Sequence, residues 1–177
     1  MKSSVGFLLE DDHESLAKLL AELDAELARP NIARAFELLD SFWARLALHI
    51  RAEHLHLFSA LADAPASLFT GKGSLPTSEE AHELLLRLRS DHNFFMTELA
   101  RLIKTMREIV DEPSAHFEEI EAVRQSMIVI KNRLEVHNQL EEEKLYLWPA
   151  LLFDESTVSN LRERLQHELE NLPARLG

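Results

Sequence analysis

The chain has 177 residues and a formal charge of −12, with 46% hydrophobic residues, 4 glycines and no cysteine. This length fits one domain with a sizeable core, and the low glycine content favours long helices over a turn-rich sheet. The acidic excess argues against nucleic acid as a partner, because phosphate binding needs clustered Lys and Arg. The lack of cysteine excludes disulfides, thiolate catalysis and cysteine-bound zinc or iron–sulfur clusters.

The sequence also leads us to expect neither a membrane-spanning helix nor a secretory signal. No stretch approaches the roughly 20 consecutive apolar residues that a membrane-spanning helix needs. The apolar run from Val5 to Leu9 is too short for the core of a secretory signal. We therefore expect a soluble cytoplasmic protein that binds neither membranes nor nucleic acid.

The first helix is expected to start near Asp11, because Asp11 and Glu14 have the spacing of a capping box. It should end at Arg29-Pro30, since the residue before a proline disfavours helical backbone. Its apolar stripe consists of residues three or four apart, which share one helix face. The stripe takes in His13 and continues as Leu16, Leu20, Leu23 and Leu27, and Leu9 would extend it if the helix began earlier.

The second helix can be capped by Asn31 and should close at Ala64-Pro65. Its stripe is apolar except at His49 and Glu53, which lie four residues apart and so point the same way. The full stripe reads Ala35, Leu39, Phe42, Leu46, His49, Glu53, Leu57 and Ala60.

A turn-rich loop over residues 65–76 precedes the third helix, which Thr77 and Glu80 should start as a capping box. One histidine, His92, interrupts the apolar stripe of this helix. The stripe reads Leu85, Leu88, His92, Phe95, Leu99, Leu102, Met106 and Ile109.

The fourth helix follows Glu112-Pro113, with Ser114 as its cap, and should run toward Trp148-Pro149, where the proline ends or kinks it. It repeats the His/Glu pair of the second helix at His137 and Glu141. Its stripe reads Met127, Ile130, Leu134, His137, Glu141, Leu145 and Trp148.

These patterns predict an all-α fold, an up-down-up-down four-helix bundle over about residues 8–152 of a single domain spanning 1–177. A shorter fifth helix, about residues 157–172, should pack on the bundle. Its apolar face consists of Leu161, Leu165, Leu169 and Leu172.

Six ionisable side chains thus fall on the inward stripes of four predicted helices: His13, His49, Glu53, His92, His137 and Glu141. Any one of these histidines, taken singly, is more often a hydrogen-bonded core residue. Six buried polar groups would each need a separate partner, whereas one dinuclear metal site would satisfy all of them. Nitrogen and oxygen donors without sulfur suit iron or manganese, with zinc as a further candidate. Glu53 and Glu141 would bridge the metals, and each metal would take two histidines.

The order His13, His49-x-x-x-Glu53, His92, His137-x-x-x-Glu141 resembles the hemerythrin-like HHE cation-binding domain family. Residues Leu145 to Pro149 are similar to the leucine, aromatic and proline run that follows the second pair in this family. The resemblance covers about residues 8–152. It implies a hemerythrin-like bundle with two iron ions, joined by an oxo or hydroxo bridge and by the two glutamates, with the four histidines as terminal ligands.

The sequence departs from the oxygen-carrying members, which place a fifth histidine four residues after the third-helix histidine. Met96 holds that position here. The six-ligand version is more similar to bacterial di-iron proteins linked to repair of iron centres and to nitric oxide or oxidative stress. We therefore expect a di-iron protein that binds or senses dioxygen, nitric oxide or peroxide. Iron storage or delivery for repair, and a metal-stabilised interaction module, are the alternatives; turnover as an enzyme is left open.

Several neighbouring residues fit the motif less well. Many family members have a second glutamate after each pair, but here His54 follows Glu53 while Glu142 follows Glu141. We assign Glu142 to the helix surface. For His56, His82 and Tyr146 the structural or surface interpretation is favoured over a role at the metal site.

Overall fold

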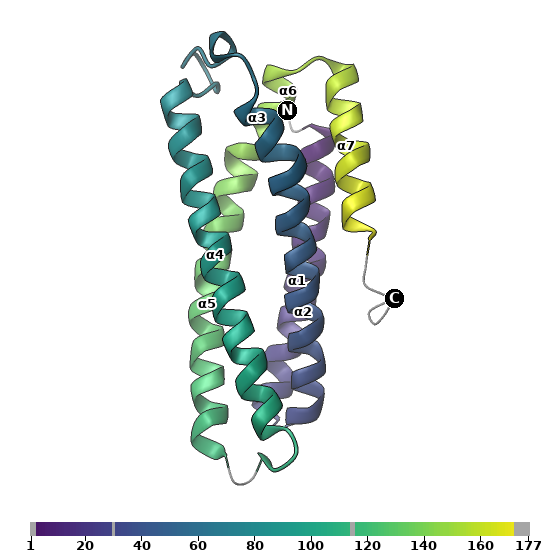
Figure 1. The fold of residues 1–177 in the computed structure, drawn as a ribbon, viewed down its shortest axis with the longest axis vertical. Helices are drawn as coiled ribbons and strands as arrows, with labels where there is room; N and C mark the ends of the chain where they lie inside the picture. Colours follow the sequence, from purple (N-terminus) through teal and green to yellow (C-terminus); the bar gives the residue numbers. More distant parts are fainter. Residues whose placement is uncertain (1–2, 30, 114–115, 172–177) are drawn as a thin grey trace.

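The computed structural model describes residues 3–29, 31–113 and 116–171. Four long helices lie side by side and alternate in direction along the chain (Figure 1). They are α1 (Ser4–Ala28), α2 (Ile32–Ala52), α4 (Ser78–Ile109) and α5 (Phe117–Glu143). The described residues contain no β-strand. The predicted all-α helical bundle is therefore confirmed.

Helix α1 begins earlier than the sequence pattern predicts. The Ser3 side chain accepts a hydrogen bond from the Gly6 N–H at 3.1 Å and so caps the helix. Val5 and Leu9 are fully buried, which stabilises the additional turns. Asp11 and Glu14 lie inside the helix, and the predicted start at a capping box there is wrong.

Helix α2 continues into a π-helical segment, η1 (Glu53–Phe58), and then into the short α3 (Ser59–Ala62). A π-helix holds more residues per turn than an α-helix, so it shifts which side chains face inward. Leu57 and Phe58 are both fully buried, whereas Ala60, predicted to face the core, is only partly buried. The first residue of this π-helix is Glu53, one of the predicted bridging residues.

The connection to α4 contains a short 3₁₀ turn, η2 (Ala66–Leu68), and ends at the predicted capping box. The Thr77 hydroxyl accepts from the Glu80 N–H at 3.2 Å, and the Glu80 carboxylate accepts from the Thr77 N–H at 2.7 Å. Gly71 adopts φ +64° in this loop, and a Cβ there would lie 2.8 Å from the Thr77 methyl group. Glycine is therefore required where the loop passes the start of α4.

Helix α5 ends at Glu143, earlier than the predicted stop near Pro149. Lys144 leaves helical geometry at φ −126° and ψ −71°, and a 3₁₀ turn, η4 (Leu145–Leu147), follows. Pro149 then lies in the first turn of α6 (Trp148–Leu152), where its missing N–H costs nothing. The proline begins a new helix rather than ending the old one.

The last helix, α7 (Glu155–Leu169), is capped by Asp154, whose carboxylate accepts from the Thr157 N–H at 2.7 Å. It lies against α1 and α2 (Figure 1). Leu161 and Leu165 are buried against the bundle, as predicted for a packing helix. Leu172, predicted to extend that face, lies outside the described residues.

The apolar interior consists of two separate clusters rather than one continuous core. The first cluster fills the end of the bundle near the α1–α2 connection, and the second fills the end covered by α7. Helices α1, α2 and α4 contribute buried residues to both clusters, whereas the buried apolar residues of α5 belong to the first and η4 supplies Leu145 to the second. The change occurs between Leu16 and Leu9 in α1, between Ile50 and Ala52 in α2, between Phe95 and Leu88 in α4, and between Leu134 of α5 and Leu145 of η4. The six predicted ligands lie at this boundary. No helix in the described part of the chain is long and apolar enough to cross a membrane.

Replacing the α4 cap by Thr77→Ala should lower the free energy of unfolding by about 1 kcal/mol, because the Glu80 N–H loses its acceptor. Urea unfolding followed by circular dichroism, at fixed metal content, measures this change. Thr97→Ala, at an exposed position inside the same helix, is the matched control and should not destabilise the protein, since alanine favours helix. Equal loss in both variants would contradict the capping role.

Candidate metal centre

Four histidines from four helices meet at the boundary between the two apolar clusters. His13 comes from α1, His49 from α2, His92 from α4 and His137 from α5, and each is at most 5% exposed. The Nε2 atoms of His13 and His49 are 3.1 Å apart, and those of His92 and His137 are 2.9 Å apart. The histidines therefore form two pairs, each with its inner nitrogens directed at a common point.

Glu53 and Glu141 lie between the two histidine pairs, and both are completely buried. Glu53 Oε1 is 3.6 Å from His49 Nε2, and its Oε2 is 3.4 Å from His92 Nε2. Glu141 Oε2 is 3.4 Å from His13 Nε2, and its Oε1 is 3.1 Å from His137 Nε2. Each carboxylate thus presents one oxygen to each pair, which is the arrangement of a bridging ligand.

Two of these carboxylate oxygens are left without a hydrogen bond. Within the described residues, Glu53 Oε2 and Glu141 Oε1 are buried and have no hydrogen-bond partner. Both face the His92–His137 pair, where a buried oxygen without a donor carries a desolvation cost. A cation at that point would remove the cost. The nitrogen and oxygen atoms also gather closely enough for metal in two groups: His13, His49 and Glu141; and His92, His137 and Glu141.

The outer nitrogens of three histidines are held by carboxylates from other helices. His13 Nδ1 lies 2.8 Å from Glu142 Oε1, and His49 Nδ1 lies 2.8 Å from Asp12 Oδ2. His137 Nδ1 lies 3.3 Å from Asp91 Oδ2. A carboxylate at this nitrogen keeps the proton on Nδ1 and leaves the Nε2 lone pair free to bind a metal.

The sequence pattern predicts Glu142 on the helix surface and predicts no role for Asp12 or Asp91. Glu142 is about one-third exposed, at 34%, yet its carboxylate contacts the buried ring of His13. The sequence does contain an indication that these aspartates lie near the histidines, because His13 directly follows Asp12 and His92 directly follows Asp91. Each aspartate supports the histidine of a neighbouring helix rather than the one beside it, which spacing alone does not reveal.

His92 differs from the other three, because its outer nitrogen contacts another imidazole. His92 Nδ1 lies 2.9 Å from His54 Nε2, and the π-helix carries His54 to this position. Phe58 stacks on His92 with ring centroids 5.7 Å apart and planes inclined by 15°. Burial and the nearby His92 lower the pKa of His54, which favours its uncharged form beside His92.

Tyr146 occupies the centre of the polar layer, although the sequence pattern favoured a structural or surface position. Its side chain is completely buried, and its hydroxyl donates to Glu53 Oε1 at 2.8 Å. The Tyr146 hydroxyl oxygen is also 3.2 Å from Glu141 Oε2 and 3.1 Å from His13 Nε2. Burial and the charges of Glu141 and Glu53 raise the pKa of the phenol well above its usual value. A neutral hydrogen-bond donor therefore lies beside the His13–His49 pair.

The layer is charged before any metal binds. Burial alone would lower the pKa of His49, but the charge of Glu53 and the hydrogen bond to Asp12 outweigh it and hold the pKa well above its usual value. Burial alone would raise the pKa of Glu141, but the charge of His137 and the hydrogen bond from His13 hold the pKa well below its usual value. Imidazolium and carboxylate groups thus neutralise one another, and a metal ion would take the place of the protons.

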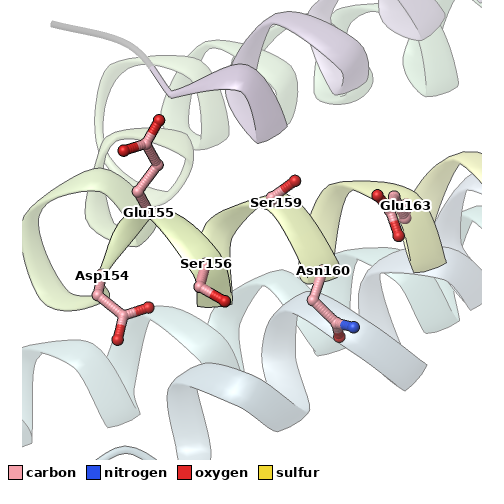
Figure 2. Close-up of a pocket in the computed structure, with 6 residues that line it drawn as sticks. All are labelled: Asp154, Glu155, Ser156, Ser159, Asn160 and Glu163. Atoms are coloured by element: carbon pink, nitrogen blue, oxygen red, sulfur yellow. The ribbon is translucent and has the colours of Figure 1, made fainter.

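The other weighed histidines lie away from the layer. His56 faces α7, where its Nε2 is 3.9 Å from Glu168 Oε2, and His82 is exposed on α4. A surface hollow near the start of α7 is likewise unrelated to the layer. The side chains that line it spread along the helix without converging on one point (Figure 2): Asp154, Glu155, Ser156, Ser159, Asn160 and Glu163.

Comparison with known families decides what kind of domain holds this layer. The family model of the hemerythrin HHE cation-binding domain matches residues 7–149. The chain belongs to the hemerythrin HHE family. No curated protein and no solved structure gave a significant match. The matched residues include all six candidate ligands, so the buried layer of side chains that could hold a metal lies within the cation-binding domain.

The carboxylates at the outer nitrogens should matter for metal affinity. Asp12→Asn removes the charge that accepts the His49 Nδ1 proton, and the affinity for iron(II) should fall about 10–100-fold. Anaerobic competition against a chromophoric chelator measures this change. Asp24→Asn is the matched control, since Asp24 pairs only with Lys131 on the surface among the described contacts. Equal affinity in the two variants would show that Asp12 contributes nothing to the metal site.

Proposed function

We propose that the protein is a non-haem di-iron protein that binds or senses a small oxidant: dioxygen, nitric oxide or peroxide. The observation that supports it most directly is the position of the two glutamates, each with one oxygen on each histidine pair. Two metals a typical ~3.5–4 Å apart would fit such a pair of carboxylates. His13 and His49 would hold one iron, and His92 and His137 the other.

The surroundings of the layer favour reactive iron over a purely structural metal. Two iron(II) ions would bring four positive charges, and Glu53 and Glu141 would offset two of them, which would make a buried position less costly. Apolar clusters on both sides keep bulk water away from the layer. Four histidines and two bridging carboxylates leave coordination positions for a small ligand, and iron bound there supplies redox chemistry.

Residues of this chain also favour reaction over reversible carriage. Met96 takes the place of the fifth histidine and packs against the first apolar cluster. The Tyr146 hydroxyl lies beside the His13–His49 pair and can donate a hydrogen bond or a proton to a bound oxidant. Iron delivery is less favoured, because ligands that are at most 5% exposed would release metal only when the bundle opens.

The decisive experiment is anaerobic titration of the metal-free protein with iron(II), followed by exposure to oxidant. We expect about two irons per chain, and a bridged diferric absorption spectrum that bleaches on reduction and changes with azide or nitric oxide. Binding of fewer than about two irons would refute the dinuclear site. Two irons with no spectral response to any small ligand would support the metal-stabilised interaction module instead.

Glu53→Ala and Glu141→Ala should each reduce the iron stoichiometry, because each removes an oxygen donor from both metal positions. Iron bound per chain after gel filtration is the measurement. Glu168→Ala is the matched control: Glu168 is also buried, but its partner is Arg51 rather than the layer, at 2.9 Å. Normal stoichiometry in both test variants would remove the bridging assignment.

Tyr146→Phe should leave iron binding unchanged but slow the oxidation of the diferrous protein by peroxide by about 10²-fold, because the donor at the layer is lost. The ring stays buried, so the fold should persist. Stopped-flow absorbance at saturating iron gives the rate. A rate within twofold of the unaltered protein would mean that the hydroxyl only orients the carboxylates.

A further inference from the structure

The two halves of the bundle support their histidines in equivalent ways but with different chemistry. The first half consists of α1 and α2 and the second of α4 and α5, and each half has one single histidine and one His/Glu pair. In each half, the residue that follows the glutamate of the pair contacts Nδ1 of the single histidine in the other half. Glu142 follows Glu141 and contacts His13 Nδ1 at 2.8 Å, while His54 follows Glu53 and contacts His92 Nδ1 at 2.9 Å. A carboxylate and an imidazole therefore occupy equivalent positions.

The acceptor at Nδ1 changes how strongly the inner nitrogen binds a metal. A carboxylate attracts the Nδ1 proton and makes Nε2 a better donor, and losing such a partner commonly lowers metal affinity about 10–100-fold. A neutral imidazole accepts the same hydrogen bond without a negative charge. Nε2 of His92 is for this reason a weaker donor than Nε2 of His13.

The supports of the second histidine in each pair increase this difference in expected metal affinity between the two pairs. His49 lies 2.8 Å from Asp12, whereas His137 lies 3.3 Å from Asp91. Asp91 also accepts two hydrogen bonds from Arg133, at 2.6 and 2.9 Å, so its charge is largely neutralised by another partner. Asp12 has a looser cationic neighbour, Arg45, at 3.5 Å. Both supporting groups thus favour the His13–His49 position.

We propose that His54 is a positioning residue that makes the two metal positions unequal, so that the first metal binds at His13–His49 and the second, more weakly, at His92–His137. The inference rests on the dinuclear site of the proposed function. It adds that the protein has a metal-loaded state with one ion, and that the more weakly held second ion is the one supported by His54.

Stepwise titration of the full-length metal-free protein with iron(II) and with cobalt(II), without oxygen, tests this inequality. We expect two resolved steps with dissociation constants about 10–100-fold apart. Crystals grown with one equivalent of cobalt(II) should show the anomalous signal at His13–His49. Two equal steps, or a first ion at His92–His137, would overturn the proposal while leaving the dinuclear function intact. Fewer than about two ions in total would instead refute the proposed function itself.

Exchange of the two supporting residues separates their chemistry from their structural role. His54→Glu should strengthen the second step about 10–100-fold and bring the two steps together, and Glu142→His should weaken the first step by a similar factor. The double exchange, His54→Glu with Glu142→His, should place the first cobalt(II) at His92–His137. Unchanged constants in a folded His54→Glu protein would overturn the proposal. Should that variant fail to fold, as judged by circular dichroism, the Glu142→His titration decides by the same criterion.

Discussion

A layer of ionisable groups that crosses the whole bundle between two apolar clusters is the constraint on which this structure depends. Such groups are costly to bury unless every polar atom has a partner. The layer meets this condition by internal pairing: inner imidazole nitrogens face each other and the two glutamates, while the outer nitrogens are held by side chains from neighbouring helices. Among the described residues of the layer, two carboxylate oxygens are left without a hydrogen bond, and both face the His92–His137 pair. A cation at the His92–His137 pair, which we infer to be the second to bind, would satisfy these two oxygens.

The same pairing fixes how the four helices align. His49 of α2 is held by Asp12 of α1, and His137 of α5 by Asp91 of α4. A shift of one helix by a single turn would move its charged residue about 5.4 Å into an apolar cluster. Leucine-rich stripes tolerate several registers, because one leucine can replace another, whereas a buried charge tolerates one. We therefore attribute the register of the bundle to the polar layer and its stability mainly to the two apolar clusters.

Much of the layer could be predicted from the sequence, because a regular helix repeats its faces and a polar residue on an apolar stripe stands out. His13, His92 and the two His/Glu pairs were predicted this way, and the structure brings all six together. Tyr146 was missed because the backbone leaves helical geometry at Lys144, after which spacing no longer tells which side chain faces inward. Phe58 was missed for the same reason in the π-helix. Asp12 and Asp91 were missed because they act between helices, where periodicity within one helix carries no information.

The two irregular segments, the π-helix η1 and the break after α5, are where the sequence-based prediction failed. They are also where the two halves of the layer differ. The break after α5 brings the Tyr146 hydroxyl to the His13–His49 side, and the π-helix brings His54 to the outer nitrogen of His92. Four regular helices with duplicated ligands would give two equivalent metal positions. The departures give the His13–His49 pair a buried hydroxyl and two carboxylate contacts, and the His92–His137 pair an imidazole and an aspartate shared with Arg133. A centre with unequal positions can hold one ion firmly while the other responds to ligand or exchanges, a division of roles that a symmetric site lacks.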